Sequence, residues 1–169
     1  MDYVILDLEW NTAYSKSAHK FVNEIIEFGA VKLDQELNII DRFSCFVKPQ
    51  VGKRISSVIT DLTSITNDNL SDAMPFLQVM SRFKKWAGDC IVTTWGPSDV
   101  LALLENCSDF GGMRPIPFLK AYVDMQVYVE KMLGVDGKEQ LGLSKAAEMT
   151  GADDSSLDHH RALVDSVLT

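Results

Sequence analysis

The sequence predicts one α/β domain, residues 1–169, in which helices flank a five-stranded mixed β-sheet. Two observations predict it. Three short strand-like runs come first and are joined by short connections, which indicates an antiparallel meander. Two further strand-like runs follow, each preceded by a helical pattern, and helical crossovers make strands parallel to an earlier one. The most economical sheet therefore has the order 3-2-1-4-5, with strand four beside strand one.

The five strands are expected in apolar, β-branched runs at 3–9, 24–33, 39–47, 90–95 and 121–125. The polar run DQELN at 34–38 reads as the hairpin connection between the second and third strands. Pro49 ends the third strand, and Gly96-Pro97 breaks the fourth. The chain therefore leaves strands one and four close to the same end of the sheet, where α/β proteins place their ligand sites.

Helices are expected where apolar residues recur at spacings of three and four, at 56–65, 74–87, 98–107, 127–133, 143–150 and from about 158 onward. The segment 66–72 (TNDNLSD) reads as a polar, turn-rich connection. No internal repeat, low-complexity tract or linker interrupts the chain.

Composition narrows the class of protein. A net charge of −8 argues against tight, non-specific duplex binding but leaves a short single-stranded end open as a ligand, because bound metals supply local positive charge. The three cysteines lack metal-site spacing and read as reduced thiols. The first residues lack a signal-peptide pattern, and no apolar run is long enough to span a membrane. A cytoplasmic protein is expected.

Asp7 and Glu9 are the first candidate site residues. Residues i and i+2 of a strand share a face, so both carboxylates should point the same way. Burying them in the apolar run YVILDLE is unfavourable unless a cation neutralises them. The spacing alone carries little weight, since Asp34 and Glu36 repeat it in a hairpin loop. The strand context distinguishes the first pair.

Asp99, His160 and Asp165 complete the candidate set. Asp99 follows strand four and lies beside Asp7 in the expected sheet, although a helix N-cap or first-turn acid is an equally good reading. His160 and Asp165 are five residues apart, about 140° around a helix, so they cannot share a face. We therefore expect His160 at or before the helix start and Asp165 facing inward. The adjacent His159 should face elsewhere.

These residue types suit two-metal phosphodiester hydrolysis. Two Mg²⁺ or Mn²⁺ ions roughly 3.5–4 Å apart need several hard oxygen ligands. A neutral histidine can accept the proton of the attacking water.

In this order, Asp7-x-Glu9, Asp99 and His160-x4-Asp165 resemble the DEDDh (DnaQ-like) 3′–5′ exonuclease superfamily, which has a ribonuclease H-like fold. The resemblance covers nearly the whole chain: NEIIEFGAVKLD resembles the second strand of the family, and SSVITDLTSIT its short wedge helix. WGPSD and the LTSIT helix look most like the ERI-type branch, which trims RNA 3′ ends.

The resemblance implies roles at matching positions. Asp7, Glu9 and Asp165 would hold one metal, Asp7 would also bind the second with Asp99 assisting through water, and His160 would be the general base. Leu62 and Ile65 would wedge against the terminal base of a single-stranded 3′ end, and the product would be a 5′-mononucleotide.

Two substrate contacts are expected from the residues themselves. Trp10 stands where the family usually has threonine, and it either stacks on a base or packs at the strand edge. Arg161, beside His160, is the best placed of the few basic residues to touch phosphate.

Other functions remain open at this point. They are a DNA proofreading or repair exonuclease, a non-catalytic regulatory module with the same fold, and a phosphatase or phosphodiesterase for small nucleotides. The sequence does not decide between RNA and DNA, between Mg²⁺ and Mn²⁺, or between oligomeric states.

Overall fold

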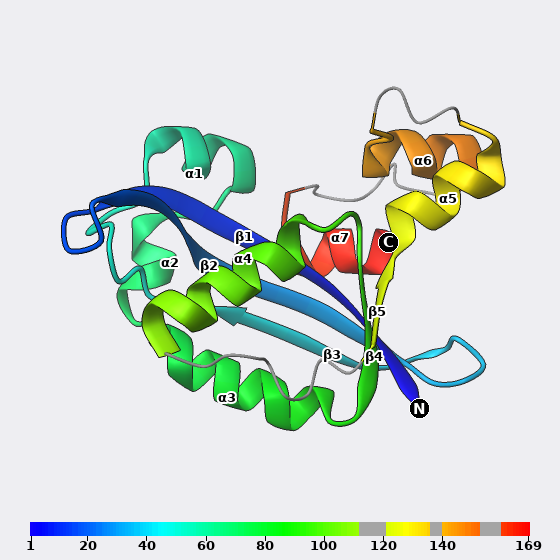
Figure 1. Ribbon diagram of the computed structural model, residues 1–169, viewed down its shortest axis with the longest axis horizontal. Helices are drawn as coiled ribbons and strands as arrows, with labels where there is room; N and C mark the ends of the chain where they lie inside the picture. Colours follow the sequence, from blue (N-terminus) through cyan, green and yellow to red (C-terminus); the bar gives the residue numbers. More distant parts are fainter. Residues whose placement is uncertain (112–120, 136–139, 153–159) are drawn as a thin grey trace.

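A computed structural model describes residues 1–111, 121–135, 140–152 and 160–169 (Figure 1). The strands form one sheet in the order β3-β2-β1-β4-β5, which confirms the expected arrangement. The strands are β1 (Asp2–Ser15), β2 (Lys20–Leu33), β3 (Ile39–Phe46), β4 (Cys90–Thr94) and β5 (Ala121–Asp124). β1, β2 and β3 pair antiparallel, whereas β4 is parallel to both β1 and β5.

The first hairpin is longer than the sequence predicts. β1 and β2 remain paired as far as Ser15 and Lys20, beyond the expected ends at Glu9 and Glu24. The polar residues of this extension satisfy one another across the ribbon, as Thr12 and Asn23 do with a 2.7 Å hydrogen bond. A two-stranded ribbon needs no apolar run when its backbone groups pair, so periodicity does not reveal it.

The helices of the described residues are α1 (Ser57–Thr63), α2 (Asn67–Ser71), α3 (Phe76–Ala87), α4 (Ser98–Asn106), α5 (Met125–Leu133), α6 (Leu143–Thr150) and α7 (Ala162–Leu168), and a π-helical turn, η1 (Cys107–Gly111), continues α4. The sequence predicted a turn-rich connection at 66–72, but residues 67–71 form the short helix α2. Thr66 caps this short helix through a capping box with Asn69, a role usually taken by Glu or Gln.

Helices cover both faces of the sheet (Figure 1). On one face, α3 is amphipathic and buries a stripe of side chains against β1 and β2, and Leu103 of α4 joins the same core. On the other face, α7 lies across β1 and β2, and a smaller cluster beneath α1 and α2 includes Ile26 and Ile65. Among the helices that the structure describes, none has the length and apolar character of a membrane span.

Candidate active site

β1 presents Asp7 and Glu9 on the face of the sheet that α7 covers. Their neighbours Leu6 and Leu8 point the other way and are 1% and 3% exposed in the core under α3. Strand alternation therefore places both carboxylates on one face, and both are half-buried. In the described residues, neither carboxylate accepts a hydrogen bond from the protein.

α7 brings Asp165 to this pair because β2 has a glycine opposite Asp7. Gly29 is the register partner of Asp7, and a Cβ atom there would lie 2.0 Å from the backbone of Ala162 and Leu163. The helix backbone therefore rests directly on the sheet. One carboxylate oxygen each from Asp7, Glu9 and Asp165 lies within 4.8 Å of the others. These three residues are called the carboxylate cluster below.

Asp99 lies next to the cluster but outside the group within 4.8 Å. It is 5% exposed in the first turn of α4, so it is the first-turn acid that its sequence context allowed. Its Oδ1 atom accepts a 2.9 Å hydrogen bond from the backbone N–H of Leu8, between the two acids of β1. The parallel β1–β4 pairing makes this contact possible, because β4 ends beside Ile5 while β1 continues past it, so that α4 begins next to Leu8.

Burial and like charges raise the pKa values of the acids at this site. Burial raises the pKa of Asp7 well above its ordinary value, and the charge of Asp99 raises it further, followed by those of Glu9 and Asp165. Burial, followed by Asp165 and then Glu27, raises the pKa of Glu9 to about 8. Burial raises the pKa of Asp99 to about 7, despite the hydrogen bond from Leu8.

A divalent cation would relieve this repulsion. Ionised carboxylates in a partly buried site are unfavourable without a cation, and oxygen atoms are the ligands that Mg²⁺ and Mn²⁺ prefer. The donor set of the carboxylate cluster, with Asp99 behind it, therefore fits a hard divalent ion. With such an ion bound, the site would be able to bind and polarise a phosphate group.

His160 lies two residues before α7 begins. Its residue is exposed, its φ angle is 63°, and its backbone N–H donates a 3.1 Å hydrogen bond to Oδ2 of Asp165. A positive φ is uncommon for a residue with a side chain, and here it turns the chain into the helix. The placement before the helix start agrees with the expectation from the five-residue spacing. His159 falls outside the described residues.

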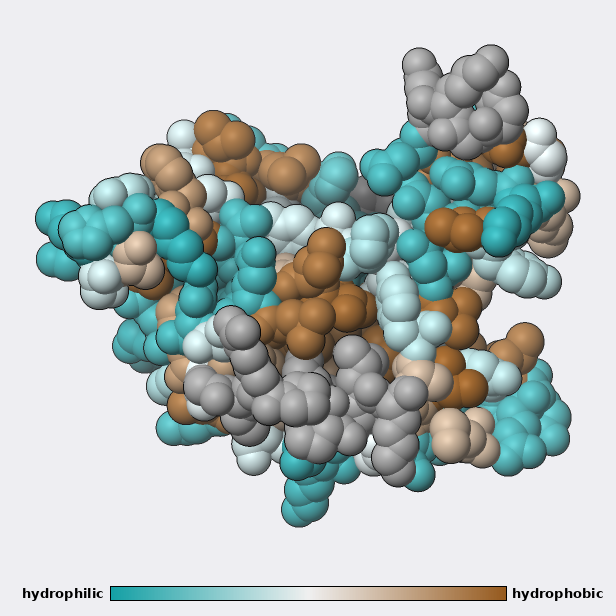
Figure 2. All heavy atoms as spheres, in the orientation of Figure 1, coloured by the Kyte–Doolittle hydropathy of each residue, from teal (hydrophilic) through white to brown (hydrophobic). Residues whose placement is uncertain are grey.

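The structure separates the two expected wedge residues. Leu62 of α1 is 49% exposed, and Figure 2 shows apolar side chains on this helix, where Val58 is also exposed. Ile65 has no exposed surface and packs with Ile26 and Ile55 beneath α1. Ile65 therefore supports the helix from below, and direct contact with a base is not available to it in this structure.

Trp10 lies on the opposite face from the acids. A β-bulge between Glu9 and Trp10 shifts the register, so that Trp10 pairs with Ile25 and packs against the core beneath α4. It also lines a surface pocket of about 230 Å³ with Ser98 and Leu101. This placement favours the packing interpretation over base stacking.

Arg161, which was expected to contact phosphate, contacts other residues of the protein. Its guanidinium binds both carboxylate oxygens of Glu27 on β2 and lies over the ring of Phe46 at 5.5 Å. The phosphate contact stays a prediction. Glu27 and Gly29 are the residues that the sequence reasoning missed. A signal existed, since an acid and a glycine interrupt the apolar run EIIEFGAV.

Comparisons with known proteins agree with this geometry. Residues 4–169 match the family model described as exonuclease (RNase_T). A PolC-type DNA polymerase III from Staphylococcus aureus is 32% identical over 168 residues, which are 99% of this chain but 11% of that protein. The chain thus spans about a ninth of the curated relatives it matches.

Solved structures show the same fold. The nuclease domain of 3′hExo, a DEDDh family member bound to rAMP, superposes with a TM-score of 0.83 at 25% identity over 99% of this chain and 86% of that one. Exonuclease I from E. coli, in complex with a dA16 oligonucleotide, has a TM-score of 0.72 at 15% identity over 99% of this chain and 39% of that one, a likeness of fold. The chain belongs to the exonuclease family, within the DEDDh 3′–5′ exonuclease superfamily.

Proposed function

We propose that the chain removes nucleotides one at a time from the 3′ end of a single-stranded nucleic acid and releases 5′-mononucleotides. RNA is the proposed substrate, and DNA is the alternative. The observation that carries this proposal is the convergence of Asp7, Glu9 and Asp165 within 4.8 Å, beside buried Asp99 and with Asp165 bonded to the backbone N–H of His160. We further propose that residues 1–169 act as one exonuclease domain in the cytoplasm.

The carboxylates have distinct roles in this proposal. Asp7, Glu9 and Asp165 would supply oxygen ligands to one ion, and Asp7 would supply one to a second ion with Asp99 nearby. Two Mg²⁺ or Mn²⁺ ions, when bound, activate water and neutralise charge on the scissile phosphate and the leaving oxygen.

His160 acts as the general base in this proposal. The role requires the ring of His160, an exposed residue just before α7, to reach a water molecule at the cluster, where a neutral imidazole would accept the proton of that water. The N–H bond to Asp165 couples the position of the base to that of a metal ligand.

Leu62 is the proposed contact for the terminal base. It is exposed on α1, whose inner side is held by buried Ile65, so the helix offers a firm apolar edge. An apolar edge recognises the face of any base and does not choose between ribose and deoxyribose. The relation to PolC-type polymerases supports the alternative of a DNA proofreading or repair exonuclease.

The test is incubation of 5′-labelled and 3′-labelled RNA and DNA with the protein and Mn²⁺ or Mg²⁺. We expect a ladder of shortening products from the 5′-labelled strands, which Asp7→Ala and His160→Ala remove. Glu36→Ala is the matched control, since it removes an acid with the same i, i+2 spacing from a hairpin loop and should keep the ladder.

Other outcomes separate the alternatives. A full ladder from Asp7→Ala would contradict the metal-site assignment, and internal cleavage would contradict the exonuclease assignment. Hydrolysis of p-nitrophenyl thymidine phosphate without any ladder would indicate a small-nucleotide phosphodiesterase. Oligonucleotide binding without hydrolysis of either substrate would indicate a regulatory module.

A further inference from the structure

We propose that Glu27 is a positioning residue that, through Arg161, fixes the start of α7 and thereby sets His160 and Asp165 against the acids of β1. This inference rests on the proposed function and adds a pair of residues that are not themselves ligands. It also gives Arg161 a role other than the phosphate contact that the sequence suggests.

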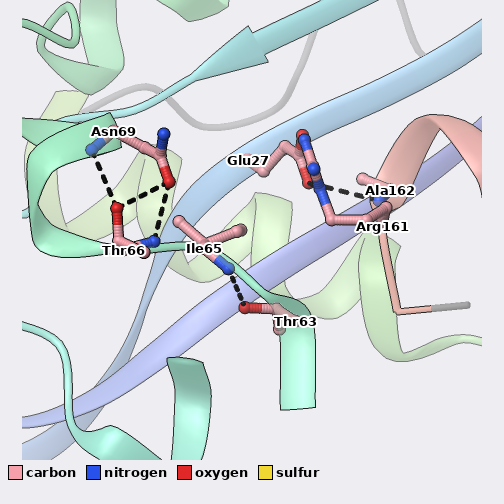
Figure 3. Close-up of polar contacts among 7 residues, drawn as sticks. All are labelled: Glu27, Thr63, Ile65, Thr66, Asn69, Arg161 and Ala162. Atoms are coloured by element: carbon pink, nitrogen blue, oxygen red, sulfur yellow. Dashed lines mark hydrogen bonds and ion pairs between the residues drawn. The ribbon is translucent and has the colours of Figure 1, made fainter. Parts of the chain in front are cut away.

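Glu27 makes three contacts with the chain at the start of α7 (Figure 3). Its side chain is 1% exposed. Nη2 of Arg161 lies 2.8 Å from Oε1 and Nε lies 3.2 Å from Oε2, so the guanidinium binds both oxygens. The backbone N–H of Ala162 donates a further hydrogen bond of 3.3 Å to Oε2. A bidentate pair fixes orientation as well as distance.

Two more contacts hold the same segment. Cζ of Arg161 lies 5.5 Å from the ring centre of Phe46, which confines the guanidinium from the side of β3. The backbone at Ala162 rests on Gly29, where no side chain intervenes. The start of α7 is therefore held by charge at Glu27 and by close packing at Gly29.

α7 needs such an anchor because it is short. Seven residues do not form a stable helix alone, and Arg161 at the N-cap position makes no side-chain capping bond. Docking therefore decides where the helix lies. His160 is the residue before Arg161, and Asp165 is one turn into the helix, so both move with the anchored segment.

The residues that anchor α7, Glu27 and Gly29, lie directly opposite the proposed metal ligands of β1 in the sheet. Glu27 is the register partner of Glu9, and Gly29 is the register partner of Asp7. The strand that carries the anchor is thus hydrogen-bonded to the strand that carries the two acids. A change in the Glu27–Arg161 contact should shift Asp165 relative to Glu9 and leave β1 in place.

A phosphate-binding role for Arg161 makes different demands. A phosphate contact that kept the Glu27 pair would use the other N–H groups of the guanidinium, and one that broke the pair would leave the buried carboxylate without its cation. A phosphate contact would contribute chiefly to substrate affinity and to its salt dependence. Positioning would contribute to turnover and to metal affinity. The two roles therefore predict different measurements.

The experiment compares Glu27→Gln, Arg161→Gln and the double variant with the wild-type chain in kcat, KM for a 5′-labelled single strand, and Mn²⁺ affinity by calorimetry. Arg161 is one third exposed, so Arg161→Gln should fold even if Glu27→Gln does not. We expect kcat and Mn²⁺ affinity each to fall about 10- to 100-fold in both single variants, as when partners of metal ligands are removed. KM should stay within about twofold, and the double variant should match the single ones.

Glu24→Gln is the matched control. Glu24 is a second buried acid of β2, 1% exposed, and it accepts backbone N–H bonds from the loop at 50–52, away from α7. This variant should lower the melting temperature and keep both kcat and Mn²⁺ affinity. Its result separates a general loss of stability from the loss of position.

Each outcome bears on one claim. A raised KM with unchanged kcat and Mn²⁺ affinity in Arg161→Gln would overturn the positioning role in favour of phosphate binding, and an unchanged variant would overturn it outright. If the wild-type chain shortens no strand, the exonuclease proposal fails. Weaker Mn²⁺ binding by both single variants would still support positioning in that case.

Discussion

Two pairs of acids lie on neighbouring strands, a buried pair on β2 and a half-buried pair on β1, and their surroundings differ. On β2, Glu24 accepts bonds from three backbone N–H groups and the Asn11 side chain, and Glu27 binds Arg161. On β1, Asp7 and Glu9 accept no hydrogen bond from the described residues and face another acid, Asp165. The β2 acids have their hydrogen-bond and ion-pair partners within the protein, whereas we propose that the β1 acids are neutralised by a bound cation.

This contrast explains how one sheet combines stability and catalysis. A carboxylate that is fully hydrogen-bonded holds segments together, as Glu24 holds a loop and Glu27 holds α7. Repulsion among clustered carboxylates lowers the free energy of unfolding of the metal-free chain, and binding of a cation raises it again. The two pairs should therefore respond oppositely to the loss of charge.

The largest expected effect comes from exchanging Glu for Gln in each pair. Glu9→Gln should reduce nuclease activity to the background without enzyme and raise the melting temperature of the metal-free chain, because it removes a repelled charge. Glu24→Gln should lower the melting temperature and keep activity, because it weakens a satisfied anchor. Nuclease assays and thermal melts in EDTA measure both. The contrast would be broken if both variants shifted stability in the same direction.

The second effect concerns His160, the proposed general base. His160→Ala should lower kcat about 10²- to 10⁴-fold, the usual contribution of a general base. The melting temperature should change little, because the residue is exposed. His19→Ala is the control, since His19 is also exposed and also has a positive φ, of 51°. Equal activity of both variants would exclude His160 from the reaction.

The pH dependence of metal-free stability is a third effect. The pKa of Glu9 is about 8 in the folded chain, against an ordinary value of 4.5, so the folded chain holds an extra proton between these two pH values. Stability therefore falls as pH rises through this window, by roughly 2–4 kcal/mol after allowance for solvent screening. Thermal melts in EDTA should show a lower melting temperature at pH 8 than at pH 5.

Mn²⁺ sharpens the same measurement. It should raise the melting temperature more at pH 8 than at pH 5, because ionised ligands bind the cation without first losing protons. Glu9→Gln should flatten the decline in EDTA. A metal-free melting temperature that rises between pH 5 and pH 8 would contradict the charge repulsion derived for the β1 acids.

The smallest expected effect is at α1. Leu62→Ala should raise KM about three- to tenfold and leave kcat and the melting temperature nearly unchanged, because the side chain is half exposed in the free protein. Leu37→Ala, at an exposed leucine in the β2–β3 connection, should change none of these. An unchanged KM for Leu62→Ala would contradict a contact between Leu62 and the terminal nucleobase.

Much of the fold could be predicted because its signals are local. Apolar runs and short connections define the meander, and the crossovers define the parallel strands. α2 was missed because its residues, NDNLS, are typical of turns, and its cap uses Asn69. The long hairpin was missed because polar pairs, Asn11 with Glu24 and Thr12 with Asn23, interrupt its apolar pattern.

The site was predictable to the extent that strand alternation and chain order define it. They bring Asp7, Glu9 and Asp165 together and place Asp99 nearby. Trp10 could not be assigned to a face, because the bulge before it depends on pairing with β2. The role of Glu27 depends on a partner 134 residues away, which no local pattern reveals.

Binding of Mn²⁺ at equilibrium tests the central claim most directly. We predict that the wild-type chain binds two Mn²⁺ ions, that Asp7→Asn weakens this binding strongly, and that Glu24→Gln does not. Undiminished Mn²⁺ binding by Asp7→Asn, or none by the wild-type chain, would contradict a metal centre built on the acids of β1.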